Sequence, residues 1–70
     1  MANILYESDN HAVIAAKGGG RILLDKITGE EVFAQPGDDA AVVDGMIASL
    51  DDVAVKRRSR IFDIAMAEYF

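Results

Sequence analysis

The sequence predicts an α+β domain, in which an antiparallel four-stranded β-meander made of two hairpins is followed by two α-helices packed on one face of the sheet. Three observations predict this class. Up to residue 35, short segments rich in Ile, Leu, Val and Tyr alternate with turn-forming residues. Pro36-Gly37 then interrupts the chain, and beyond it the apolar residues recur at helical spacing. No change of composition marks a linker, so residues 1–70 are interpreted as a single small domain.

The two hairpins are predicted from four short segments. Residues 3–6 and 11–16 flank a tetrapeptide dense in turn formers and make the first hairpin. Residues 21–27 and 31–35 make the second, which turns at Thr28-Gly29 because glycine tolerates a positive φ.

Three consecutive glycines, Gly18, Gly19 and Gly20, connect the hairpins. A phosphate-binding loop places such glycines directly before the N-terminus of a helix. Here the residues that follow, 21–24, have the pattern of a strand. We therefore interpret the glycine run as a flexible connection.

A first helix is predicted because four apolar residues are spaced i, i+3, i+4 and i+7. These residues are Val43, Met46, Ile47 and Leu50. Asp38 or Asp39 is expected to cap the N-terminus of the helix, and Asp51-Asp52 to end it or to cap the next one. Gly45 lies inside the helix, where glycine costs about 1 kcal/mol relative to alanine, and we expect it to allow close approach of a strand.

A second helix is predicted over residues 53–70. Its apolar face is broad, since one stripe carries Ile61, Ala65 and Tyr69 and a neighbouring stripe carries Phe62, Met66 and Phe70. We expect Tyr69 and Phe70 to close the core as the last turn of the packed helix. The alternative is that they form a recognition tail for a partner.

The composition narrows the classes of function. With no cysteine and one histidine, His11, the chain has neither a disulfide nor the ligands of a structural zinc site, and we predict no metal and no cofactor. A domain this small buries little surface, and its 51% of hydrophobic residues favours a homodimer. The N-terminus lacks the features of a signal peptide, and no apolar run approaches the roughly 20 residues that cross a bilayer. We therefore expect a cytoplasmic protein with no membrane partner.

The charge is unevenly distributed. There are 12 acidic and 7 basic residues, and the net charge of −5 disfavours general binding to nucleic acid or to anionic membranes. Four of the bases form a basic cluster: Lys56, Arg57, Arg58 and Arg60. Three interpretations remain open for this cluster. It is a solvated helix face with the ion pairs Asp52–Lys56 and Arg60–Asp63, a docking site for an acidic protein, or a contact with phosphates.

No group of residues has the spacing of a catalytic site. The acidic pairs, such as Asp38-Asp39 and Asp51-Asp52, are sequence neighbours that fit helix capping or the helix macrodipole. His11 lacks a partner whose spacing would single it out as a base, and we expect an exposed or strand-edge histidine. We predict no catalytic residue and no enzyme activity.

The segment Arg57-Arg58-Ser59-Arg60, followed by an apolar stretch ending in Glu68-Tyr69-Phe70, resembles the second helix of ribbon-helix-helix repressors. In that family a basic, serine-containing turn leads into an apolar helix that ends near Glu-Tyr-Leu. The resemblance implies that Val43, Ile47 and Leu50 belong to the first helix of the motif. It also implies that Ser59 and the arginines contact phosphates in an intertwined dimer. The chain departs from the family at residues 31–35, which carry no base for a major groove, and in its four-stranded N-terminal half.

These patterns predict a small acidic protein-binding module that regulates a larger protein by docking on it, as inhibitors of host proteins from phages and mobile elements do. The contacts are predicted at one of two places. One is the acidic edge of the first helix, with Asp39, Asp44 and Asp51, and the other is the basic cluster. The alternative is a dimeric DNA-binding transcriptional regulator with a C-terminal half of the ribbon-helix-helix type.

Overall fold

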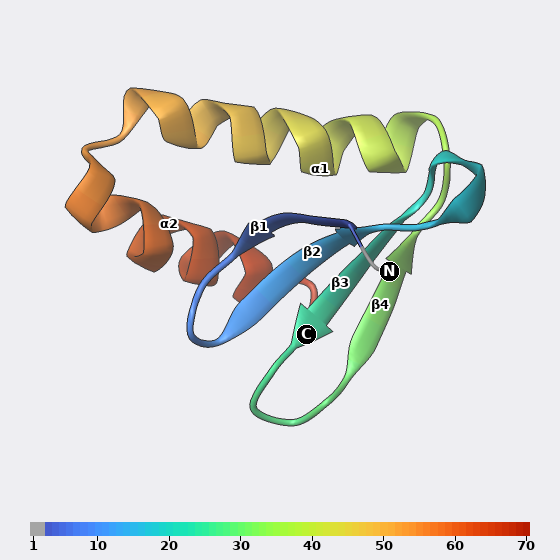
Figure 1. Cartoon of the computed structure of the whole chain (residues 1–70), viewed down its shortest axis with the longest axis horizontal. Coiled ribbons are helices and arrows are strands. Elements are labelled where there is room, and N and C mark those ends of the chain that lie inside the picture. Colours follow the sequence, from blue (N-terminus) through green and yellow to red (C-terminus); the bar gives the residue numbers. More distant parts are fainter. Residues whose placement is uncertain (1–2) are drawn as a thin grey trace.

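In the computed structural model, which describes residues 3–70, four strands precede two helices, as the sequence predicts (Figure 1). The strands are β1 (Asn3–Glu7), β2 (His11–Ala15), β3 (Arg21–Asp25) and β4 (Glu31–Ala34). The helices are α1 (Asp38–Ser49) and α2 (Val55–Ala67). Two 3-10 turns, η1 (Lys17–Gly19) and η2 (Leu50–Asp52), lie in the connections. The expectation about a signal peptide depends in part on Met1 and Ala2, which lie outside the described residues.

The strands form one antiparallel sheet in the order β1-β2-β3-β4, which confirms the predicted meander. Leu23 of β3 lies opposite Val13 on one side and Val32 on the other. β1 and β4 each pair with one neighbour only and are therefore the edges of the sheet. Gly29 has a φ of 80°, so the second hairpin turns where the sequence predicts, at a residue that favours the left-handed region.

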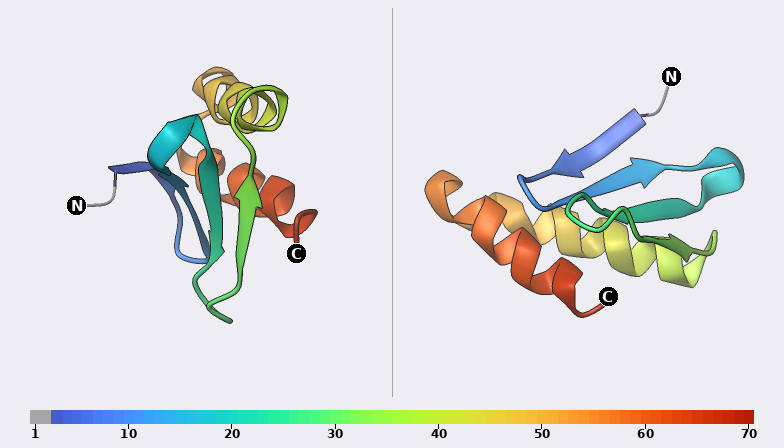
Figure 2. Two further views of the ribbon diagram at one scale, coloured as in Figure 1. Left: turned by 90° about the vertical axis from the view of Figure 1, so that its right-hand side faces the viewer. Right: turned by 90° about the horizontal axis from the view of Figure 1, so that it is seen from below.

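Both helices lie on the same side of the sheet (Figure 2). Because side chains alternate along a strand, Val13, Leu23 and Val32 share the face that the helices cover. The opposite face carries a row of apolar side chains across all four strands: Ile4, Ile14, Ile22 and Phe33. Ile4 and Phe33 of this row are about half exposed.

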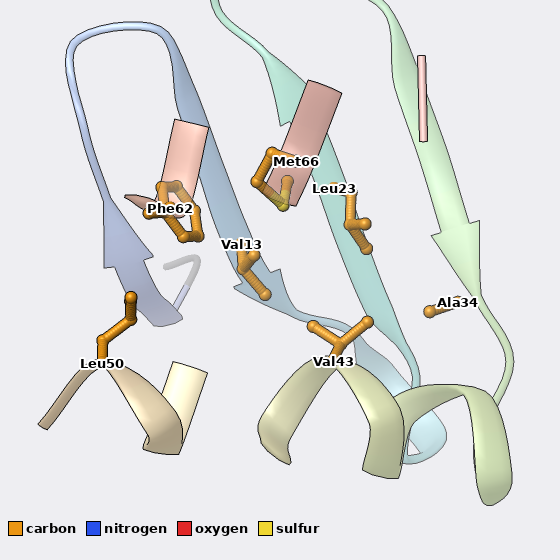
Figure 3. Close-up of a cluster of buried hydrophobic side chains, with 7 residues drawn as sticks. All are labelled: Val13, Leu23, Ala34, Val43, Leu50, Phe62 and Met66. Atoms are coloured by element: carbon orange, nitrogen blue, oxygen red, sulfur yellow. The ribbon is translucent and has the colours of Figure 1, made fainter. Parts of the chain in front are cut away.

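The core is a cluster of seven buried side chains that joins the two helices to the sheet (Figure 3). Phe62 and Met66 of α2 are fully buried and point toward the sheet, and Phe62 contacts the ring of Tyr6 with a centroid distance of 4.6 Å. Val43 and Leu50, at the two ends of the predicted stripe on α1, are also buried. The apolar periodicity thus predicts the face of each helix that packs on the sheet.

Two expectations about helix caps are wrong. Neither Asp38 nor Asp39 caps α1, because the chain enters the helix at Gly37 with a φ of 100° and both aspartates already lie in the first turn. There they face the positive end of the helix dipole. Asp51-Asp52 lies in η2, and α2 begins after Ala54 without a side-chain cap.

Two further expectations fail for reasons of packing. Gly45 does not allow close approach of a strand, since it is exposed and a Cβ built there would meet nothing within 4 Å. α2 ends at Ala67, and the following Tyr69 and Phe70 are 39% and 38% exposed and lie outside the buried core. The three glycines between the hairpins contribute to η1 and to the turn into β3. Among residues 3–70, no helix has the length and apolar character that a membrane crossing requires.

Candidate functional site

An apolar groove of about 300 Å³ lies between β4, α1 and Tyr69, the second residue after α2. Its deepest part is lined by side chains of the core: Leu23, Ala34 and Val43. It is also lined by Val32 and Phe33 from β4, Val42 from α1, and Tyr69. The side chain of Phe33 belongs to the row on the opposite face of the sheet, so Phe33 lies at the edge of the groove. Asp39, in the first turn of α1, is also among the lining residues. We call this feature the β4 groove.

Two apolar residues at the β4 groove are exposed, although valine and phenylalanine are often fully buried in folded proteins. Val42 is 63% exposed and Phe33 is 50% exposed. The ring of Phe33 lies over Gly20, where an added Cβ would be only 2.5 Å from a ring atom. Glycine at position 20 therefore makes room for the ring of Phe33 on the face of the sheet opposite the helices, a role that the glycine run does not reveal in the sequence.

Acidic residues lie at the starts of the two elements that border the β4 groove. Glu31 is the first residue of β4 and Glu30 precedes it, and Asp38 and Asp39 lie at the start of α1. All four are exposed, and among residues 3–70 none of the four takes part in a salt bridge. The groove is therefore an apolar surface between two elements that each begin with exposed acidic residues.

The three acidic residues predicted as contacts along the first helix lie in different surroundings. Asp39 lines the β4 groove. Asp44 is held by Arg21, whose Nε donates to Oδ1 and whose terminal nitrogen donates to Oδ2, both at 2.9 Å. These hydrogen bonds lower the pKa of the Asp44 carboxyl below its ordinary value. Asp51 lies in η2, beyond the opposite end of α1. The structure does not bring the three residues together.

The basic cluster divides into exposed and partly buried members. Lys56, Arg57 and Arg60 are exposed. Arg58 is half-buried, and its guanidinium donates to the backbone carbonyls of Val53 at 3.0 Å and Asp51 at 3.3 Å. Arg58 thereby donates hydrogen bonds to two backbone carbonyl groups in and just after η2. Carbonyl groups at the end of a helix lack hydrogen-bond partners within the helix.

The two ion pairs expected around the basic cluster are not formed. In the described part of the chain, no salt bridge joins Asp52 to Lys56 or Arg60 to Asp63. Asp63 is unavailable to Arg60 because its carboxylate lies against the first hairpin. It accepts hydrogen bonds from Ser8 Oγ and, at 3.2 Å, from Asn10 Nδ2.

His11 is neither exposed nor at a sheet edge, which corrects the expectation from the sequence. It is 8% exposed and lies on β2, an inner strand. Its Nδ1 is 2.9 Å from Oδ1 of Asp63, the oxygen that also accepts from Ser8. Fifty-two residues separate His11 from Asp63, so no local sequence pattern indicates that they meet.

Ser8, His11 and Asp63 do not have the geometry of a catalytic triad. Activation of a serine requires a hydrogen bond from its hydroxyl to the histidine base, whereas here Ser8 and His11 both bond to the same carboxylate. The Ser8 hydroxyl also accepts the backbone N–H groups of Asn10 and His11. The cluster therefore fastens the β1–β2 turn to α2. Among residues 3–70, no three His, Cys, Asp or Glu side chains converge as metal ligands do.

The residues that resemble a ribbon-helix-helix motif lie in α2 and just beyond it. Arg57, Ser59 and Arg60 are exposed at its start. The strand before α1, β4, pairs with β3 of the same chain. Comparisons of the chain with protein-family models, with curated proteins and with solved structures find no match.

Proposed function

We propose that this protein is a small acidic protein-binding module that docks on a larger protein through the β4 groove. One observation supports the proposal above all others: Val42 and Tyr69 are exposed beside an apolar depression, and exposed carboxylates lie on the elements that border it. Among residues 3–70, no salt bridge engages these carboxylates. Protein interfaces commonly combine an apolar and aromatic centre with a polar rim. Aromatic side chains are also enriched among the residues that contribute most to binding.

The sign of the charge defines the partner surface. Glu30, Glu31, Asp38 and Asp39 repel nucleic acid and anionic membranes and attract a basic surface, which raises the rate of association. The module covers that basic surface when it binds. We therefore expect it to act on its partner as an inhibitor, by occupying a site that another ligand would use.

DNA binding is a second candidate, and one observation favours it. Lys56, Arg57 and Arg60 are exposed at the start of α2, and within residues 3–70 no salt bridge neutralises them. Phosphate contacts by such residues would make binding fall steeply with salt concentration. The homodimer that the composition favours also remains a prediction.

Chemical cross-linking in a lysate of the native host, with nuclease present, tests the two candidates with a matched pair of variants. Val42→Glu places a charge at the β4 groove, and Val55→Glu places the same charge beside the basic cluster. Both valines are exposed in a helix, at 63% and 74%, so neither change disturbs the core. We expect a discrete protein partner that is cross-linked to the wild-type chain and to Val55→Glu and is lost with Val42→Glu.

The opposite pattern would support the second candidate. If nucleic acid is recovered, and its recovery fails when Lys56, Arg57 and Arg60 are changed to glutamine, the chain binds phosphates through α2. A protein partner that is retained by Val42→Glu and lost with Val55→Glu would move the docking site to the basic cluster.

A further inference from the structure

The open side of β4 presents backbone groups beside the β4 groove. Among residues 3–70, β4 pairs only with β3, and the Asp25 N–H donates to the Glu30 carbonyl at the start of this ladder. In an antiparallel ladder, successive residues direct their N–H and C=O groups alternately toward and away from the neighbouring strand. The backbone groups of Glu31 and Phe33 therefore point away from the sheet, where a further strand would pair with them.

The β4 groove lies where the side chains of such an added strand would fall. Val32 and Ala34, on the helix-facing side of β4, line the groove together with Val42 of α1 and Tyr69. Every second side chain of a strand next to β4 would project to this side. The groove, with a volume of about 300 Å³, receives apolar side chains there.

The acidic residues near β4 indicate what kind of strand could pair with its open edge. Glu31 lies on the face of β4 opposite the groove, and Asp38 and Asp39 follow the C-terminal end of β4 in the chain. A second copy of this chain, added edge to edge, would bring another set of these carboxylates close to the first. A strand with lysine or arginine at the positions that face away from the groove would instead complement Glu31.

We propose that β4 binds an extended segment of a partner protein as a fifth strand, with alternate apolar side chains in the β4 groove and basic side chains facing the acidic residues around it. Recognition by strand addition derives affinity from backbone hydrogen bonds and specificity from pockets for alternate side chains. This inference rests on the proposed docking function and specifies its mode and the chemistry of the partner.

Selection of short random peptides against the full-length folded chain tests the proposal, with the Val42→Glu variant used to remove peptides that bind elsewhere. We expect the selected peptides to alternate apolar residues with lysine or arginine. A representative peptide is then synthesised twice, once unmodified and once with N-methyl groups on alternate backbone nitrogens. We expect the methylated form to bind at least about tenfold more weakly, equivalent to about 1.4 kcal/mol, because it cannot complete the ladder.

Amide hydrogen exchange, measured by NMR on the chain with the unmodified peptide, locates the contact. We expect the exchange of the Glu31 and Phe33 amides to slow on binding. The affinity should also fall with added salt, and less steeply for Glu31→Gln combined with Asp39→Asn. Equal binding by the two peptides, or selection of acidic peptides, would overturn the proposal. So would the same amide protection appearing without peptide as protein concentration rises, because a second copy would then occupy the edge.

Different experimental results would contradict the proposed docking function and the proposed addition of a fifth strand. If Val42→Glu loses the cross-linked partner while the methylated peptide binds as tightly as the unmodified one, docking stands and strand addition is wrong. If cross-linking recovers only nucleic acid and no peptide is selected, both are wrong.

Discussion

Two glycines of this chain have opposite backbone requirements, so the same substitution should have opposite effects. Gly45 lies on the exposed side of α1, and a Cβ there meets nothing within 4 Å. We expect Gly45→Ala to raise the free energy of unfolding by about 0.5–1 kcal/mol. A Cβ at Gly29 also meets nothing within 4 Å, but Gly29 has a φ of +80°. Gly29→Ala should therefore lower the free energy of unfolding by about 1 kcal/mol.

Urea denaturation followed by circular dichroism checks this pair. The midpoint should rise for Gly45→Ala and fall for Gly29→Ala, with the slope unchanged in both. If Gly45→Ala lowered the midpoint, the exposed side of α1 would have to be packed against something.

The Asp63 carboxylate provides the second prediction for single residues. Asp63→Ala removes the acceptor for Ser8 Oγ and for His11 Nδ1, both on buried residues. A buried polar group left without a partner costs about 1–3 kcal/mol, so we expect a loss of stability in this range. Glu68→Ala removes an exposed carboxylate just after the same helix and should change stability by less than about 0.5 kcal/mol. Equal denaturation midpoints for the two variants would show that the cluster does not hold α2 to the hairpin.

Between elements, Arg21 and Asp44 connect β3 to α1. Hydrogen bonds from Arg21 lower the pKa of Asp44, and the backbone N–H groups of Thr28 and Ile27 lower the pKa of Asp25 in the β3–β4 turn. Since an unfolded aspartate titrates near 3.9, the folded state binds fewer protons than the unfolded state as the pH falls below that value. The stabilisation is therefore complete above about pH 4 and is lost as the pH falls through the folded pKa values.

We expect Asp44→Asn to lose stability less steeply than the wild type between about pH 4 and pH 2, because one of the titrating carboxyls is absent. Urea denaturation at a series of pH values measures the slope. Gly45→Ala serves as the control, since it changes no charge and should shift the curve equally at each pH. A slope in Asp44→Asn identical to that of the wild type would contradict the coupling between Arg21 and Asp44.

Local chemistry in the sequence was sufficient to predict the elements. The turn at Gly29 needs a residue that tolerates positive φ, and the apolar spacing from Val43 to Leu50 fits one helix face. The prediction failed where distant elements decide the outcome. Arg60 lies three residues before Asp63, yet Asp63 forms its hydrogen bonds with a hairpin more than 50 residues away in the sequence. The β4 groove likewise combines β4, α1 and Tyr69, and only Asp39 of its lining was among the predicted contact residues.

The whole molecule depends on one small core. A domain of 70 residues has a total stability of about 4–10 kcal/mol, and truncation of a buried phenylalanine costs about 3–5 kcal/mol. Phe62 is fully buried and contacts Tyr6. We therefore expect Phe62→Ala to unfold a large fraction of the molecules near 37 °C.

Thermal unfolding followed by circular dichroism measures this loss. Ile64→Ala lies two residues along α2, at a side chain that is 57% exposed, and should melt within a few degrees of the wild type. A wild-type melting temperature for Phe62→Ala would mean that the two helices do not share one cooperative core with the sheet.

The link between the β1–β2 turn and Asp63 also has a consequence for biosynthesis. The first hairpin is synthesised before Asp63, so Ser8, Asn10 and His11 can bond to its carboxylate only after α2 is made. Contacts between distant residues are slow to form because the intervening chain must be ordered first. Tyr69, which completes the β4 groove, is added later still. A nascent chain therefore has no finished groove, and capture of a partner begins only after the C-terminal helix has emerged and packed.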